Sequence, residues 1–182
     1  MNKPDTFGHS CDDYHKLIAA SVVTHAEKLG RNVDYVEIGT FTGNSAAAVL
    51  ATGKIRRAVL IDNFSLDLAG RIQSAEKVSQ RLAQYAGLFE IMVGDCRKIM
   101  PNVNETFDVG FVDGDHAEES CRIDMTNMLP KLNPDGVMFI HDVGNEPFTY
   151  LLPVVARFAK DNKLTMILHA VQDGLAELRR KT

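Results

Sequence analysis

Hydrophobic residues fall into short blocks along the chain, separated by polar residues and glycines. The first block consists of Val33, Tyr35, Val36 and Ile38, an apolar and largely β-branched set that is typical of a strand buried in a parallel sheet. Similar blocks predict four further strands, over 58–61, 88–93, 107–112 and 137–140. Apolar residues at helical spacing predict helices from 12 or 13 to 29, over 44–50, 68–86 and 148–160, and around 121–129.

Strand and helix thus alternate five times, which predicts an α/β fold. We expect a doubly wound, Rossmann-like sheet that is mostly parallel and has helices on both faces. Two last apolar segments, 164–170 and 175–179, are joined by Gln-Asp-Gly and predict a hairpin. That hairpin is expected to add an antiparallel edge strand to the sheet.

Two local expectations follow from the same pattern. Residues 133–136 read Asn-Pro-Asp-Gly and predict a turn before the fifth strand. The long helix over 68–86 is expected to bury one stripe of side chains: Ile72, Val78, Leu82 and Tyr85.

Residues 37–45, Glu-Ile-Gly-Thr-Phe-Thr-Gly-Asn-Ser, join the first strand to its helix through two glycines. A strand, a glycine turn and a helix N-terminus form the half-site that holds adenosine-type ligands in doubly wound folds. Gly39 permits a sharp bend, and Gly43 permits close approach of the backbone to a ligand or a strand. Glu37 can accept hydrogen bonds from a cationic or hydroxylic ligand but would repel a pyrophosphate. Such turns also carry two glycines for geometry alone, so this motif leaves ligand binding open.

Polar residues gather where the predicted strands end, the edge at which open α/β sheets bind ligands. They are six acidic residues and two histidines, without lysine or arginine: Glu37, Asp62, Asp95, Asp113, Asp115, Asp142, His116 and His141. Asp62, followed by Asn63, is placed to accept hydrogen bonds from ribose hydroxyls or to cap the next turn. Asp95, followed by Cys96, is placed to bind an adenine amine or to cap a helix.

Asp113 and Asp142 end the fourth and fifth strands, which are expected to be neighbours in the sheet. Two close carboxylates favour a cation between them, and hard divalent cations prefer oxygen ligands, so the pair predicts a Mg²⁺-like site. His116 is a candidate general base, because imidazole titrates near neutral pH, or else a solvated loop residue. His141 is open between a metal ligand, a second base and a hydrogen-bond partner of Asp142.

Composition indicates one ordinary globular domain. The chain has 182 residues, of which 45% are hydrophobic and 24% charged. A net charge of −4 without a Lys/Arg cluster argues against nucleic acid or an anionic membrane as partner. The three cysteines (Cys11, Cys96 and Cys121) are widely spaced and suggest neither a disulfide framework nor a zinc motif. No run approaches the roughly 18 apolar residues of a membrane span, and the N-terminus is polar, so a cytoplasmic protein is expected.

The stretch 37–45 closely resembles the first motif of class I S-adenosylmethionine-dependent methyltransferases, in the form found in the catechol and caffeoyl-CoA O-methyltransferase branch. Residues 107–116, 128–137 and 140–143 resemble the subfamily with an Asp-Gly-Asp-His signature, here 113–116. The resemblance covers about residues 33–143. It implies the class I methyltransferase fold, with S-adenosylmethionine as cofactor.

The resemblance also implies roles for individual residues. The cofactor would contact Glu37, Gly39, Thr40, Gly43, Ser45, Asp62, Asn63, Asp95, Cys96 and Asp113. Within that set, the residues from Glu37 to Ser45 would hold the methionine part, Asp62 the ribose, and Asp95 with Cys96 the adenine. Asp113 and Asp142 would bind the metal, and His116, Asp113 and His141 would form the catalytic group.

The sequence departs from the catechol branch at the end of the fifth strand. Where that branch has Asp-Asn or Asp-Asp, Val143 follows Asp142 here, so a third metal ligand would have to be Asp115, His141 or Asn145. The chain also has little beyond its core. Residues 1–30 are expected to form an arm and a helix that cap a methyltransferase core at 31–182. A loop around 145–148, or the partner in a homodimer, would complete the acceptor pocket.

The expected activity is methyl transfer from S-adenosylmethionine to an oxygen of a small-molecule acceptor, assisted by Mg²⁺. A catechol, a sugar hydroxyl and a carboxylate are all compatible with the sequence. One alternative is a nucleotide-dependent oxidoreductase, against which Glu37 and the absence of Gly-x-Gly-x-x-Gly argue. The other is a non-catalytic S-adenosylmethionine-binding module. The replacement of a metal ligand by Val143 and the small size of the cap are both consistent with this alternative.

Overall fold

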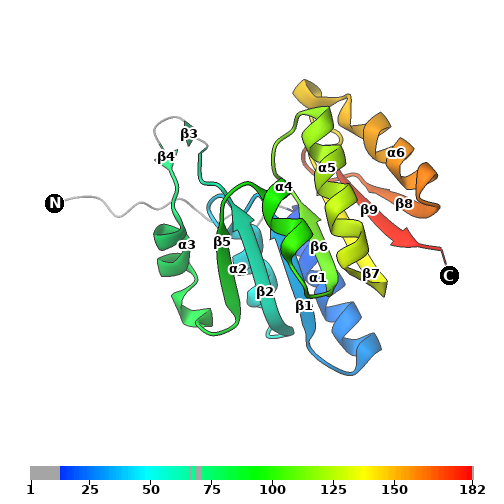
Figure 1. Ribbon diagram of the computed structural model, residues 1–182. Helices are drawn as coiled ribbons and strands as arrows, with labels where there is room; N and C mark the ends of the chain where they lie inside the picture. The colour runs from blue at the N-terminus through cyan, green and yellow to red at the C-terminus, as the bar shows by residue number, and fades with distance from the viewer. Residues whose placement is uncertain (1–12, 66, 69–70, 182) are drawn as a thin grey trace.

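The structure is a computed structural model that describes residues 13–65, 67–68 and 71–181. Among these residues, seven strands form one sheet in the order β5-β2-β1-β6-β7-β9-β8 (Figure 1). The strands are β1 (Val33–Ile38), β2 (Ile55–Asp62), β5 (Phe89–Val93), β6 (Phe107–Val112), β7 (Leu132–His141), β8 (Leu164–His169) and β9 (Leu175–Arg180). Neighbours pair in parallel except around β9, which runs antiparallel to β7 and β8. The predicted fold class is confirmed, with β9 inside the sheet and β8 at its edge.

Helices cover both faces of the sheet. The helices of one face are α1 (Asp13–Leu29), α2 (Asn44–Leu50) and α3 (Ala75–Arg81), and those of the other are α4 (Cys96–Ile99), α5 (Glu118–Met128) and α6 (Leu151–Asp161). Short 3₁₀ turns are η1 (Ala83–Tyr85), η2 (Met100–Asn102), η3 (Leu129–Lys131) and η4 (Glu146–Phe148). A separate ribbon pairs β3 (Asp67–Leu68) with β4 (Arg71–Ile72). No helix in this described part is long and apolar enough to cross a bilayer.

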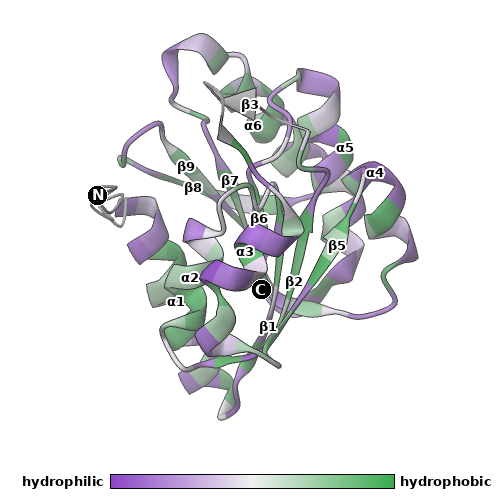
Figure 2. Ribbon diagram, turned by 90° about the vertical axis from the view of Figure 1, so that its left-hand side faces the viewer, coloured by the Kyte–Doolittle hydropathy of each residue, from purple (hydrophilic) through white to green (hydrophobic). Residues whose placement is uncertain are grey.

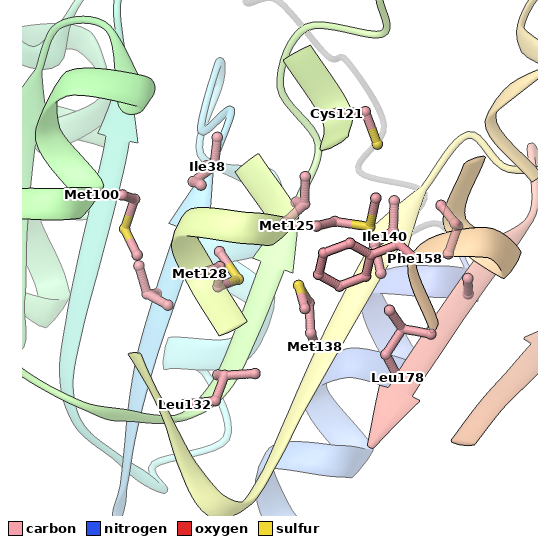
Figure 3. Close-up of a cluster of buried hydrophobic side chains, with 14 of the residues drawn as sticks. Ile38, Met100, Cys121, Met125, Met128, Leu132, Met138, Ile140, Phe158 and Leu178 are labelled. Carbon is pink, nitrogen blue, oxygen red and sulfur yellow. The ribbon is translucent and has the colours of Figure 1, made fainter. Parts of the chain in front are cut away.

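The strands inside the sheet contribute side chains to two hydrophobic cores, because successive side chains point to opposite faces. In β1, Val33 and Tyr35 join the core under α1–α3, whereas Val36 and Ile38 join the core under α4–α6. Hydrophobic strands therefore lie between the helix layers (Figure 2). The core under α4–α6 is rich in sulfur, and Figure 3 shows the side chains that supply it: Met100, Cys121, Met125, Met128 and Met138.

The long helix predicted over 68–86 is wrong in its first third. The chain forms the β3–β4 ribbon there, and α3 begins only at Ala75. Ser74 is extended and its hydroxyl accepts the N–H of Lys77, which makes it the helix N-cap. Ile72 is consequently 58% exposed on β4, although Val78 and Leu82 are buried as expected.

The turn predicted over 133–136 does not separate β7 from what precedes it. These residues lie within β7, where the pairing with β6 shifts register between Phe107 and Val109. Asn133 donates its side-chain amide to Asp108 at 2.7 Å. A Cβ on Gly136 would lie 3.2 Å from the carbonyl oxygens of Phe107 and Asp108. The Asn-Pro-Asp-Gly sequence therefore forms an irregular part of β7 that lies close to β6.

The chain order places a topological switch point between β1 and β6. From β1 the chain passes to β2 and β5 on one side, and from β6 it continues to β7 on the other. Ligands of open α/β sheets bind at the carboxyl ends of the strands that flank such a point. In this protein those ends are Gly39 after β1 and Asp113 after β6.

Candidate functional site

A cavity of about 360 Å³ lies at the switch point. Eight residues singled out from the sequence line it: Gly39, Asp62, Asn63, Asp95, Cys96, Asp113, Asp115 and His116. The loops that follow β1, β2, β5 and β6 thus all contribute to the wall of the cavity. The other predicted site residues are not on its wall: Glu37, Thr40, Gly43, Ser45, His141 and Asp142.

The two glycines of the first loop have different roles. Gly39 has φ +89°, and a Cβ there would lie 2.0 Å from the carbonyl oxygen of Asp113. The absence of a side chain therefore lets the ends of β1 and β6 meet. Gly43 has φ +76°, and its Cβ would lie 3.0 Å from Cγ1 of Val78, so its close neighbour in the structure is α3.

Asp62 ties the glycine loop to the end of β2. Its carboxylate accepts the backbone N–H of Phe41 and that of Phe64, each at 2.6 Å. Phe41 has φ 45°, a conformation that L-residues rarely adopt, and this hydrogen bond helps to hold it. Asp62 therefore orders two turns, and its oxygens keep further lone pairs for a ligand on the cavity side.

Glu37 is fully buried behind the glycine loop. The Tyr35 hydroxyl donates to Oε2 at 2.6 Å, while Oε1 has no hydrogen-bond partner among the described residues. Burial raises the pKa of Glu37 to about 8, so the side chain is mostly protonated at neutral pH. A cation beside Oε1 would favour its ionised form.

Asp95 acts as the N-cap of α4. Its carboxylate accepts the backbone N–H of Arg97 at 3.0 Å and pairs with the guanidinium of the same residue through Nε and Nη2. Hydrogen bonding by Arg97 lowers the pKa of Asp95. Of the two interpretations of Asp95 from the sequence, the capping one describes the contacts it makes here.

Acidic groups and histidines cluster where β6 and β7 end. Asp113, His141 and Asp142 each offer one ligand atom, and these atoms lie within 4.8 Å of one another. Nδ1 of His141 is 3.3 Å from Asp113 and 3.2 Å from Asp142. Nε2 of His116 donates to Asp142 at 2.6 Å. The two strand ends are adjacent, as expected from the parallel order of the strands.

Charge in this cluster is balanced by the histidines. Hydrogen bonds with Asp113 and Asp142 raise the pKa of His116 to about 9. Burial lowers the pKa of His141, but the same two carboxylates outweigh it and raise the value to about 10. Against the effect of burial, His116, His141 and Asn145 hold the pKa of Asp142 well below its usual range. Both imidazoles are therefore protonated at neutral pH in this arrangement.

Aromatic rings pack against both histidines. Phe148 stacks on His116 with ring centroids 4.3 Å apart and an interplanar angle of 9°. Tyr14 of α1 lies against His141 with centroids 3.9 Å apart. The N-terminal helix and the loop around 145–148 thus both reach the cluster.

Sequence reasoning missed several residues of the cavity wall, among them Phe41, Arg97, Ser120 and Asp124. Asp124 is buried on α5, and the thiol of Cys96 donates to its Oδ1 at 3.1 Å. The sequence does contain a sign that Asp124 is buried. It follows Cys121 by three positions and precedes Met128 by four, which places a carboxylate on the apolar face of the helix. Asp115, named among the strand-end acids, accepts the Ser120 hydroxyl at 2.6 Å.

The comparisons with known proteins agree with this architecture. A family model described as a methyltransferase domain matches residues 36–143, more than half of the chain. A search of curated proteins finds no match. Among solved structures, the O-methyltransferase TomG from Streptomyces achromogenes, in complex with S-adenosylmethionine, has a TM-score of 0.68 at 21% identity, covering 93% of this chain and 80% of TomG.

Two further structures share the fold. A protein from Staphylococcus aureus described as a caffeoyl-CoA O-methyltransferase has a TM-score of 0.72 at 18% identity, covering 92% of this chain and 83% of its own. The O-methyltransferase NovP has a TM-score of 0.72 at 17% identity, covering 93% and 80%. The family match spans both the glycine loop and the cluster at the ends of β6 and β7. The chain therefore belongs to the class I S-adenosylmethionine-dependent methyltransferases.

Proposed function

We propose that this enzyme transfers the methyl group of S-adenosylmethionine to a hydroxyl oxygen of a small molecule. The observation that carries the proposal is the position of His116 and Asp113 on the wall of the cavity that Gly39 and Asp62 also line. A cofactor site and a group able to exchange a proton with the acceptor thus share one space.

The charge of the site supports this cofactor over a dinucleotide. S-adenosylmethionine carries a sulfonium and an ammonium group, which acidic walls stabilise, whereas the pyrophosphate of NAD would be repelled. We assign the ribose to Asp62 and Asn63, and the methionine part to the loop from Glu37 to Ser45, including Thr40. The unpartnered Oε1 of Glu37 is suited to the ammonium group. Cys96 would border the adenine.

The cluster at the ends of β6 and β7 fits a divalent cation. Asp113 and Asp142 supply carboxylate oxygens, which Mg²⁺ and Mn²⁺ prefer, and His141 adds an imidazole nitrogen, a donor more typical of transition-metal ions. His141 would stand in for the acidic ligand that Val143 replaces. A bound cation would lower the pKa of the acceptor hydroxyl.

His116 is the proposed general base. It can accept a proton only as neutral imidazole, and next to two uncompensated carboxylates it is protonated at neutral pH. The base role therefore requires that a cation take over the compensation of Asp113 and Asp142, which lowers the pKa of His116. Stacking by Phe148 fixes the plane of the His116 ring. The Tyr150 hydroxyl donates to the backbone carbonyl of His116 at 3.0 Å.

The acceptor is proposed to lie between α1 and the loop around 145–148. In this assignment residues 1–30 form the cap and 31–182 the core, and Tyr14 supplies part of the acceptor wall. The acidic surroundings and the net charge of −4 favour a small molecule over a nucleic acid.

Calorimetric titration with S-adenosylhomocysteine tests the cofactor. We expect micromolar binding to the wild type, no binding of NAD, and weakening by about 10- to 100-fold in Asp62→Ala, because charge-assisted hydrogen bonds are lost. Asp161→Ala removes an exposed carboxylate of α6 and should bind like the wild type. Binding of NAD in place of S-adenosylhomocysteine would overturn the proposal.

Metal removal tests the cation site. With any acceptor that the enzyme methylates, EDTA should abolish most turnover and excess Mg²⁺ or Mn²⁺ should restore it. Asp142→Asn should weaken metal binding, so that more Mg²⁺ or Mn²⁺ is needed to restore turnover, while S-adenosylhomocysteine binding stays intact. Full turnover in EDTA would remove the metal from the mechanism and with it the base role of His116 at neutral pH.

A further inference from the structure

Asp124 is a buried carboxylate to which the proposed function gives no role. It lies on α5, it is 1% exposed, and it forms part of the cavity wall. Oδ1 accepts the thiol of Cys96, but Oδ2 has no hydrogen-bond partner among the described residues. A buried oxygen without a partner is costly, so a ligand that supplies a donor there gains affinity.

The other acidic residues of the cavity wall already have protein partners. Asp62 binds two backbone N–H groups, Asp95 pairs with Arg97, and Asp115 accepts the Ser120 hydroxyl. Asp113 lies against His141. Among the described residues that line the cavity, Asp124 alone has a buried carboxylate oxygen left over.

The surroundings of Asp124 suit a flat, mostly apolar group with one donor at its edge. Oδ2 lies 3.2 Å from the position that a Cβ on Gly114 would take, and Ile38 is equally close to that position. Ile61 and Cys96 also line the cavity. These apolar surfaces stabilise a planar base, and a carboxylate among them fixes its orientation.

The hydrogen-bond donors of S-adenosylmethionine limit which group could bind Oδ2 of Asp124. This argument rests on the proposed function, which takes S-adenosylmethionine as the cofactor. The ammonium group is assigned to Glu37, and the ribose hydroxyls are assigned to Asp62. The remaining donor is the 6-amino group of adenine. Asp95, which the sequence favoured for this contact, is engaged by Arg97 on both of its oxygens.

We propose that Asp124, rather than Asp95, accepts a hydrogen bond from the 6-amino group of the cofactor's adenine and thereby selects adenine over a 6-oxo purine. A 6-oxo purine turns a carbonyl oxygen toward Oδ2, where two acceptors face each other. Burial also raises the pKa of Asp124 to about 6, which shows that its charge is poorly solvated before a donor arrives.

The test compares S-adenosylhomocysteine with its 6-oxo analogue, in which hypoxanthine replaces adenine, by calorimetric titration. The wild type should prefer the adenine compound by about 10- to 100-fold. Asp124→Asn should lose or invert this preference, because its amide can donate to the 6-oxo group. Asp95→Asn is the matched control and should keep the preference. The melting curve of Asp124→Asn should match that of the wild type, since an amide replaces a poorly solvated carboxylate without change of shape. Asp95→Asn loses the ion pair with Arg97, so its melting curve serves only to show that the variant is folded at the temperature of the titration.

Each outcome decides between named possibilities. Loss of preference in Asp124→Asn with retention in Asp95→Asn supports the assignment. The reverse pattern overturns it and returns the adenine contact to Asp95, and an unchanged preference in both variants also overturns it. Failure of the wild type to bind S-adenosylhomocysteine at all would contradict the proposed function itself, and this result is separable because it appears before any variant is compared.

Discussion

Replacing His116 by alanine is expected to lower kcat by roughly 10²- to 10⁴-fold and to leave the Kd for S-adenosylhomocysteine nearly unchanged. The imidazole is held against Asp142 at 2.6 Å and stacked on Phe148, so its position is fixed before the acceptor binds. Proton transfer from the acceptor depends on that position, whereas the cofactor assignments place no contact on His116. The measurement is steady-state turnover with an acceptor that the wild type methylates, beside calorimetry with S-adenosylhomocysteine.

His169→Ala is the control for this experiment. His169 also pairs with a carboxylate, Glu177 at 2.9 Å, but it lies on β8 and is not on the cavity wall. Its loss should leave both kcat and cofactor affinity unchanged. If His116→Ala weakens cofactor binding as much as turnover, His116 is a binding residue and the base must be sought elsewhere.

Gly39→Ala is expected to abolish measurable binding of S-adenosylhomocysteine and to lower the free energy of unfolding by at least about 2 kcal/mol. The new Cβ would lie 2.0 Å from the carbonyl oxygen of Asp113, which is rigid backbone, so the ends of β1 and β6 must separate. The φ of +89° adds a conformational cost of about 1 kcal/mol or more for an L-residue. Calorimetry and thermal melting measure the two effects separately.

Gly53→Ala isolates the conformational part of that cost. Gly53 also has a positive φ, +66°, but no atom lies within 4 Å of the position of its Cβ. This variant should lose about 1 kcal/mol of stability and bind the cofactor normally. Normal binding by Gly39→Ala would show that the contact between the two strand ends is not needed for the site.

The elements that depend on local pattern could be predicted from the sequence. β1 begins at Val33 and ends at Ile38 as expected, because Val33, Tyr35, Val36 and Ile38 are apolar and a buried strand of a parallel sheet is rich in such residues, even though Asp34 and Glu37 lie among them. The meeting of Asp113 and Asp142 was also predictable, since both follow strands of one parallel sheet. Their convergence needed only the strand order.

The features that the sequence did not reveal depend on contacts between distant elements. Helical spacing shows that α1 has an apolar face, but not that Tyr14 packs on His141. Asp95 could be recognised as a polar strand end, whereas its pairing with Arg97 depends on side-chain geometry. The spacing of Leu68 and Ile72 predicts a helix where the structure has β3 and β4, because the pattern does not show that Ser74 caps α3 and so sets its start.

The sulfur-rich core has a consequence for the way the site responds to its ligands. Helix α5, which carries Asp124, rests on Met125 and Met128, and these pack with Met100 and Met138 (Figure 3). Unbranched thioether side chains have three rotatable bonds and refill space after small displacements, unlike the β-branched residues of the strands. We therefore expect that α5 can shift slightly without leaving a void beneath it. The part of the cavity wall that α5 supplies is accordingly expected to be compliant, and the part at Gly39, which is fixed by backbone contact with Asp113, to be stiff.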